Sequence, residues 1–166
     1  MRLIPSTLVA CAALLAVPIA LGGCATKPKP VASAPPAAEV AEPTRVVDRA
    51  AADRLLNAKG VTLQWIGWSQ RGPVNAWEKD GTIYLMGSQS DPAGPGRLFM
   101  DGRVEEIGAD YFTFRGTIRI TDTPDPGRKC EQDKLWHFAI TQNRPYWRLR
   151  EFEWCDYLTD YVDIYF

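Results

Sequence analysis

Two stretches of the chain alternate strictly between apolar and polar residues. In YFTFRGTIRIT, residues 111–121, one face carries Phe112, Phe114, Ile118 and Ile120, and threonines and arginines occupy the other. In DYVDIYF, residues 160–166, the even positions are apolar except the first, and the odd positions carry two tyrosines and one aspartate. A period of two is typical of a strand with one buried face. Both stretches therefore predict half-buried antiparallel strands.

The same period recurs along most of residues 61–154, where residues that favour turns interrupt it. Further predicted strands are 61–68, 74–78, 82–88, 97–100, 103–107, 135–141 and 146–154. Asp80-Gly81 and Asp101-Gly102 stand between neighbouring runs, where tight hairpins need residues that tolerate positive φ. The proline- and glycine-rich stretches 90–96 and 121–133 predict loops. We expect a mainly β domain, a small antiparallel barrel or roll of about seven to nine strands, with a sandwich as the alternative.

A helical period precedes the strands. In RVVDRAAADRLLNAKG, residues 45–60, Val47, Ala51 and Leu55 are spaced by four and Gly60 is a natural stop, which predicts one short amphipathic helix. Residues 24–44 are rich in proline and alanine, a composition that favours a disordered tether. Residues 45–166 are enough for a single globular β domain with one core.

The N-terminal segment has the features of an export signal. Arg2 provides a basic start, and LVACAALLAVPIA, residues 8–20, is apolar but shorter than the about 20 residues that span a membrane. The run ends in LGGCAT, where Leu21, Gly22 and Gly23 precede Cys24. This arrangement resembles the lipobox of bacterial prolipoproteins, in which a large aliphatic residue and two small ones precede the modified cysteine. The alternative is an ordinary signal peptide with an incidental cysteine.

The resemblance implies a cellular location. Residues 1–23 would be removed and Cys24 would carry acyl chains, palmitate among them, that hold the protein to a membrane. Ala25 follows the cysteine, in place of the aspartate that resembles an inner-membrane retention signal. We therefore expect attachment to the outer membrane of a Gram-negative bacterium, with the domain facing the periplasm.

Export changes what the remaining cysteines can do. Of the four cysteines, Cys11 lies in the apolar run and Cys24 in the lipobox, which leaves Cys130 and Cys155. Two cysteines in an oxidising compartment usually pair, and no Cys-x-x-Cys motif points to redox chemistry. We expect a structural Cys130–Cys155 disulfide.

The sequence offers little catalytic chemistry. His137 is the only histidine and alternates with apolar residues, which predicts the outer face of a strand and a structural role. Glu105 and Glu106 should point to opposite faces unless a bulge intervenes, whereas Glu151 and Glu153 share a face but lie near basic residues. We expect no enzyme, no cofactor and no metal site. Removal of Arg2 leaves 18 of the 19 basic residues against 20 acidic ones, which argues against nucleic-acid binding.

Aromatic residues are the most distinctive feature of the folded part. Six tryptophans and six tyrosines can build a core, stack on sugars or anchor a protein interface. Trp65 alternates with apolar residues and is expected in the core. The candidate binding residues are Trp68, Trp77, Arg148, Tyr161, Asp163 and Tyr165.

Three functions fit this pattern. The first is a non-catalytic envelope protein that binds another envelope protein through an exposed patch of Arg148, Tyr161, Asp163 and Tyr165. The second is a module for peptidoglycan or polysaccharide, which requires two coplanar exposed rings beside amide or carboxylate groups. The third is a lipocalin-like carrier, which requires an apolar cavity where Gly67, Gly87 and Gly116 leave room.

Overall fold

The computed structural model describes residues 42–166, so the predicted signal peptide, Cys24 and residues 25–41 of the predicted tether lie outside the described residues. The described chain forms nine strands and one helix, which confirms the mainly β prediction. The elements are β1 (Arg45–Val46), α1 (Arg49–Leu56), β2 (Gly60–Leu63), β3 (Val74–Lys79), β4 (Thr82–Ser90), β5 (Arg97–Ile107), β6 (Tyr111–Thr121), β7 (Lys129–Ala139), β8 (Tyr146–Leu149) and β9 (Val162–Tyr165).

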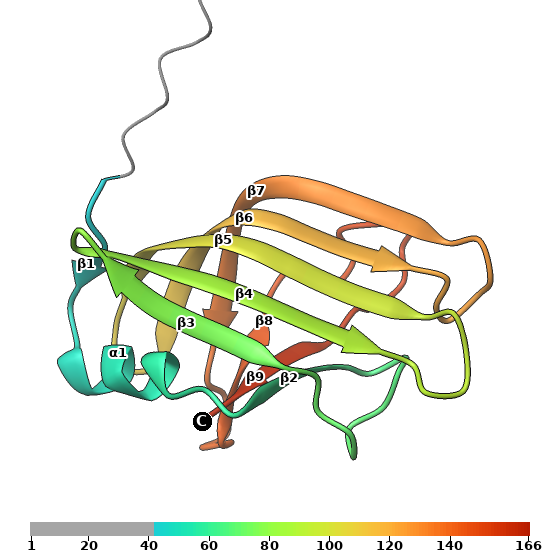
Figure 1. Ribbon diagram of the computed structural model, residues 1–166, viewed down its shortest axis with the longest axis horizontal. Coiled ribbons are helices and arrows are strands. Elements are labelled where there is room, and N and C mark those ends of the chain that lie inside the picture. The colour runs from blue at the N-terminus through green and yellow to red at the C-terminus, as the bar shows by residue number, and fades with distance from the viewer. Residues whose placement is uncertain (1–41) are drawn as a thin grey trace, which may run out of the picture. The chain divides into compact units, whose positions relative to one another are not determined.

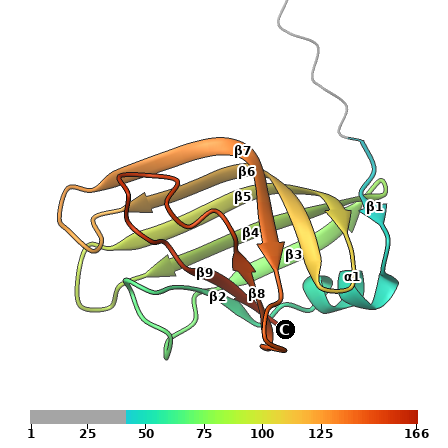
Figure 2. The ribbon, with the colours of Figure 1, turned by 180° about the vertical axis from the view of Figure 1, so that it is seen from behind.

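The strands form one nearly closed antiparallel barrel. The sheet order is β2-β9-β8-β7-β6-β5-β4-β3, and the two-residue β1 adds a parallel pairing beside β5. The long strands β4 to β7 curve across one side, and β8, β9 and β2 cross behind them (Figures 1 and 2). The ends of the sheet meet where Val61 and Gly72 exchange backbone hydrogen bonds of 3.0 and 2.8 Å.

A buried glutamine completes this closure. The Gln89 side chain accepts a 2.5 Å hydrogen bond from the Leu63 N–H, and its amide nitrogen donates to the Gly67 and Gln70 carbonyls. The backbones also approach closely, because a Cβ added at Gly72 would lie 1.8 Å from the Ser88 oxygen. Only glycine fits there.

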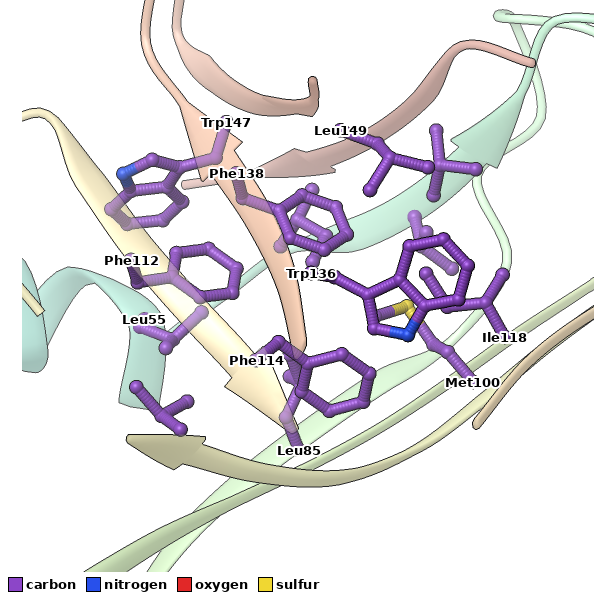
Figure 3. Packing of buried hydrophobic residues seen from close by; sticks show 14 of the residues in the cluster. Leu55, Leu85, Met100, Phe112, Phe114, Ile118, Trp136, Phe138, Trp147 and Leu149 are labelled. Atoms are coloured by element: carbon purple, nitrogen blue, oxygen red, sulfur yellow. The ribbon is translucent and has the colours of Figure 1, made fainter. Parts of the chain in front are cut away.

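Large side chains fill the barrel. Figure 3 shows Phe112, Phe114, Trp136, Phe138 and Trp147 packed against one another, and each of them is 0% exposed. The Phe112 and Phe138 rings stack with centroids 4.9 Å apart, and Trp147 meets Phe112 edge-on at 5.6 Å. These rings occupy the volume that a carrier would need for a ligand.

Two of the glycines that the carrier hypothesis invoked also face packed atoms. A Cβ at Gly87 would lie 3.0 Å from Met100, and one at Gly116 would lie 2.3 Å from the Asp101 oxygen. These two glycines allow close packing inside the barrel. The expectation that they leave room for an enclosed apolar cavity is wrong, and Gly116 instead borders an open depression on the sheet.

The helix closes one end of the barrel. Asp48 caps α1 by accepting the Ala51 N–H at 2.7 Å, and Ala51, Ala52 and Leu55 are buried. Val47 remains 58% exposed because it precedes the helix. No helix in the described part of the chain is long and apolar enough to cross a membrane.

The domain begins slightly earlier than its composition suggests. Thr44, assigned to the tether, is buried, donates from its hydroxyl to the Val104 carbonyl at 2.7 Å, and accepts the Ile83 N–H at 2.8 Å. The Thr44 hydroxyl thus bonds to backbone groups of β4 and β5 that lie about 40 and 60 residues further along the chain.

Several strand boundaries differ from the prediction. The Asp80-Gly81 hairpin is confirmed, with φ of 52° and 78°, but Asp101-Gly102 lies inside a continuous β5. Gly102 faces Gly116 on β6, and a Cβ at Gly102 would lie 2.2 Å from the Arg115 oxygen. This glycine therefore permits two strands to approach closely and does not form a turn.

The other differences lie at strand ends. β7 starts at Lys129, inside the stretch expected to be a loop, and β8 ends at Leu149, so 150–154 is irregular. β2 also ends early, at Leu63, which leaves Trp65 in a turn, half-buried against the core, with its indole N–H donating to Asp160 at 2.9 Å.

Candidate functional site

The six candidate binding residues separate into two groups. Trp77 lies on β3 and stacks on Tyr84 of β4. The other five gather around β8 and β9, in a set that we call the arginine–aromatic cluster. Its members are Trp68, Arg71, Arg144, Tyr146, Arg148, Arg150, Phe152, Tyr161, Asp163 and Tyr165.

Arg148 is the centre of this cluster. Its Nε and Nη2 donate to the two Asp163 carboxylate oxygens, each at 2.7 Å, in a bidentate pair. Its guanidinium carbon also lies 4.2 Å from the ring centroid of Tyr161, 5.2 Å from that of Tyr146 and 5.4 Å from that of Trp68. Stacking of this kind fixes the guanidinium in one orientation.

Two residues expected on the surface of this cluster are buried. Asp163 is 0% exposed, and Tyr165 is 8% exposed under the Arg71 guanidinium, which lies 3.8 Å from its ring centroid. Burial raises the pKa of Asp163, and the hydrogen bonds from Arg148 offset part of that rise. The prediction of an exposed patch made of Arg148, Tyr161, Asp163 and Tyr165 is therefore wrong. Strand β9 is buried on both faces, because the chain between β2 and β3 covers its outer side.

What the cluster presents to solvent is mainly cationic. Trp68 is 43% exposed, and Arg71 and Arg150 are also exposed. Asp163 is the acid that neutralises Arg148, so three of the four arginines of the cluster have no acidic partner within it. The cluster combines a well-packed base with an exposed tryptophan and guanidinium groups.

The second group is a row of outward side chains that crosses the sheet. The strand register places Trp77, Tyr84, Arg103, Arg115 and Leu135 opposite one another, each on a different strand from β3 to β7. We call these five residues the outer row. The next positions along the strands carry Asn75, Met86, Asp101, Thr117 and Asp133.

Two aromatic rings stand at one end of the outer row. The Trp77 and Tyr84 rings lie 16° from parallel with centroids 5.5 Å apart, and both side chains are half-buried. Asn75 and Asp101 are exposed in the neighbouring positions. The rings are parallel and lie beside an amide and a carboxylate, but they are stacked on each other and half-buried, so the arrangement meets only part of the requirement of two coplanar exposed rings.

The outer row lines two depressions on the sheet. One, of about 410 Å³, is bounded by Tyr84, Asp101, Arg103 and Asp133 among others. The other, of about 730 Å³, is bounded by Arg103, Glu105 and Glu106 among others. Arg103 borders both. Volumes of this size lie in the range of small-molecule sites, roughly 300–1,000 Å³.

The acidic pairs are engaged by basic groups or hydrogen-bond donors. A bulge between Val104 and Glu106 does intervene, and both Glu105 and Glu106 border the outer depression. Arg115 donates to Glu105 at 3.0 Å, while Glu106 accepts from the Tyr111 hydroxyl and pairs with Arg45 at 2.7 Å. The hydrogen bonds from Tyr111 and Arg45 lower the pKa of Glu106, which is the opposite of what a general acid needs.

The remaining catalytic candidates are Glu151, Glu153 and His137. Glu151 and Glu153 lie outside any strand, and Glu151 accepts the backbone N–H of His137 at 3.1 Å. Glu151 and Glu153 therefore do not share a strand face as expected. His137 lies on β7 between the buried Trp136 and Phe138, as expected, and its ring stacks on Tyr111 at 5.8 Å.

The disulfide joins β7 to the irregular segment after β8. Cys130 and Cys155 are bonded, with their Cα atoms 5.9 Å apart, which confirms the expected pair. Cys130, Cys155 and Asp156 form the one group of possible metal ligands within residues 42–166, but both sulfurs are bonded to each other and the Asp156 carboxylate pairs with Arg128 at 2.8 Å. The donor set does not fit a metal ion.

Sequence reasoning missed four of the five residues of the outer row, Tyr84 and Arg103 among them. Tyr84 and Arg103 alternate outward in their strands, which the pattern indicates, but their place beside Trp77 follows from the register of three strands. No local signal reports that register.

Comparison with known proteins assigns the chain to a family. No solved structure matches it. A protein of Pasteurella multocida (strain Pm70) named PM1083 is 30% identical over 116 residues, which cover 69% of this chain and 74% of that protein. The sequence model of the PM1083 family matches residues 43–166, which is nearly the whole described domain. The chain belongs to the PM1083 family.

Proposed function

We propose that this protein is a lipoprotein anchored through Cys24 in the outer membrane of a Gram-negative bacterium, and that its β domain binds envelope glycan without catalysing a reaction. The anchor rests on the lipobox-like Leu21-Gly22-Gly23-Cys24. The glycan-binding function rests on one observation, the parallel Trp77 and Tyr84 rings on the outer face of the sheet.

The physical basis is the stacking of a sugar on an aromatic face. A pyranose ring presents a patch of C–H groups that packs on an aromatic side chain, while its hydroxyls need hydrogen-bonding partners at the edge. Tyr84 borders the 410 Å³ depression, and Asp101 and Thr117 supply oxygens there. A rigid sheet holds these groups at fixed spacing, so little conformational entropy is lost on binding.

The carboxylates near this surface support binding over catalysis. Glu105 and Glu106 each pair with an arginine, and the low pKa of Glu106 keeps it ionised. Hydrolysis of a glycosidic bond requires one carboxylic acid that holds its proton near neutral pH. The outer face is therefore better suited to hold a polysaccharide than to cleave it.

The test is sedimentation with purified peptidoglycan sacculi. Full-length protein in detergent is mixed with sacculi and pelleted, and Trp77→Ala/Tyr84→Ala is compared with Tyr157→Ala, which removes a tyrosine that is 91% exposed and outside the outer row. We expect the wild type and Tyr157→Ala to sediment and the double variant to stay in solution. Equal sedimentation of all three, or of none, would refute the proposal.

The anchor has a separate test. Replacement of Cys24 by serine should move the protein from the outer-membrane fraction to the soluble periplasmic fraction, and metabolic labelling with an alkyne analogue of palmitate should be lost. Cys11→Ser is the matched control because Cys11 lies in the segment that would be removed. Retention of Cys24→Ser in the membrane would contradict lipid anchoring.

A second candidate function is docking of another envelope protein on the arginine–aromatic cluster. The observation that favours it is the exposed Trp68 beside the Arg148 guanidinium, because tryptophan and arginine dominate the binding energy of protein interfaces. The excess of arginine selects an acidic partner.

Photo-crosslinking on living cells tests this second function. A photoreactive residue at position 68 should capture one protein, and the charge reversals Arg71→Glu/Arg150→Glu should abolish the adduct. The same probe at position 157 is the control. An adduct that survives charge reversal, or forms equally at position 157, would contradict docking on the cluster.

A further inference from the structure

Arg103 stands at the centre of the outer row. It lies directly opposite Tyr84 on β4 and opposite Arg115 on β6, and its side chain is half-buried. It borders both depressions, so a ligand in either one meets its guanidinium.

The charges around Arg103 are unevenly balanced. Two arginines directly opposite each other on adjacent strands repel. Arg115 is neutralised by Glu105, with Nε and Oε1 3.0 Å apart. The Arg103 side chain, by contrast, forms no hydrogen bond or ion pair with another residue of the described range 42–166. The sheet therefore holds a guanidinium without an ion-pair partner beside an aromatic ring.

The two acidic groups nearby, Asp101 and Asp133, do not pair with Arg103. Asp133 accepts a 3.0 Å hydrogen bond from the Thr117 hydroxyl. Asp101 lies two residues before Arg103 on the same face of β5, is exposed, and forms no ion pair with it. Asp101 is placed to accept hydrogen bonds from ligand hydroxyls, while the guanidinium can donate to a ligand acceptor and binds an anionic one most strongly.

We infer that the ligand of the outer row is an acidic sugar, whose ring stacks on Tyr84 and whose carboxylate binds Arg103. This inference rests on the proposed glycan-binding function and names the chemical class of the glycan. A guanidinium donates two parallel hydrogen bonds to a carboxylate, a bidentate geometry that a lysine cannot reproduce. Stacking alone would not separate acidic from neutral sugars, so Arg103 determines the specificity.

A matched pair of probes isolates the carboxylate. The disaccharide N-acetylglucosaminyl-N-acetylmuramic acid carries a free lactyl carboxylate, and its methyl ester lacks the charge and adds one methyl group. Titration calorimetry on the full-length protein in detergent should show at least tenfold tighter binding of the acid, and that preference should weaken as salt is raised.

Variants assign the preference to Arg103. Arg103→Gln should bind acid and ester alike, at the affinity that the wild type shows for the ester, and Arg103→Lys should recover only part of the preference. Arg119→Gln is the control: Arg119 also points outward on β6, but it stacks on Phe99 and lies 3.7 Å from Glu131, outside both depressions named above. It should keep the wild-type preference.

The outcomes separate this inference from the proposed function. Equal binding of acid and ester by the wild type, or a preference that survives Arg103→Gln, overturns the acidic-sugar assignment while sedimentation with sacculi still supports glycan binding. Failure of the wild type to bind either disaccharide, together with failure to sediment, overturns both.

Discussion

The sharpest prediction on stability concerns Arg128, which ties the loop after β6 to the chain before β9. Its side chain is 4% exposed and donates two hydrogen bonds to Asp156 and two to Asp160, at 2.8 to 2.9 Å. Replacement by methionine keeps the aliphatic stem and removes the charge.

The two aspartates should respond differently to this change. The Asp156 side chain is 42% exposed, so water can replace the lost bonds at little cost. The Asp160 side chain is 0% exposed and would keep only the Trp65 indole N–H as a donor to its carboxylate. Removing one partner of a buried pair costs about 3–5 kcal/mol, because the other charge stays buried without compensation.

We therefore expect Arg128→Met to lose about 3–5 kcal/mol of the free energy of unfolding, on the order of 10–20 °C in Tm. Guanidinium denaturation followed by tryptophan fluorescence measures this change in the free energy of unfolding. The double variant Arg128→Met/Asp160→Asn should recover part of the loss, because it removes the buried charge as well. Arg119→Met, which breaks a half-exposed pair with Glu131, should cost under about 1 kcal/mol. If Arg128→Met cost no more than Arg119→Met, or the double variant were no more stable than the single one, the buried Asp160 would not be the cause.

Three further predictions follow from other parts of the structure. Cys130→Ala/Cys155→Ala should lower the free energy of unfolding by about 3 kcal/mol, because the disulfide closes a loop with a sequence separation of 25. Thermal unfolding of the variant should no longer respond to reductant, and a Tm equal to that of the wild type would refute the prediction. Hydrogen bonds from Tyr111 and Arg45 lower the pKa of Glu106, and those from Arg128 lower the pKa of Asp156. The stabilisation from each carboxylate is therefore complete only well above its unfolded-state pKa, about 4.3 for glutamate and about 3.9 for aspartate, and is lost as the pH falls through the lower pKa of the folded protein. Urea titrations between pH 6 and 2 should show a shallower decline for Glu106→Gln than for the wild type. Gly116→Val should abolish folding, because the new Cβ would lie 2.3 Å from the Asp101 oxygen, whereas Thr117→Val on the outer face should stay soluble with native circular dichroism.

The fold was predictable where one strand carries its own pattern. β6 is buried at each alternate position, so its face and its length could be read from residues 111–121 alone. The Asp80-Gly81 turn was predictable for the same reason, since two adjacent residues with positive φ define it. Asp101-Gly102 has the same local signature, but the glycine is required by a neighbouring strand, which the local sequence does not reveal.

The burial of β9 was harder to predict from the sequence. Its odd positions, Asp163 and Tyr165, have polar groups that suggest an outward face, yet they are covered by Arg71 and paired with Arg148. A buried polar group is stable only with its partners, and these partners come from segments about 15 and 94 residues away in the sequence. The residue pattern of one strand cannot show whether a polar side chain faces solvent or a buried partner from a distant segment.

The candidate site shows the same limit most clearly. Each member of the outer row can be assigned to an outward face from alternation within its own strand. Their grouping depends on the register of five strands, and a shift of one residue in any pairing would turn that strand's side chains to the other face. The glycine pair Gly102 and Gly116 restricts that register, because each needs the other opposite it to avoid a backbone clash. The close approach of the two glycines therefore also places Arg103 opposite Arg115, one residue along the strands. The same packing constraint thus determines both how the inner faces of β5 and β6 pack and which arginine stands in the proposed binding surface.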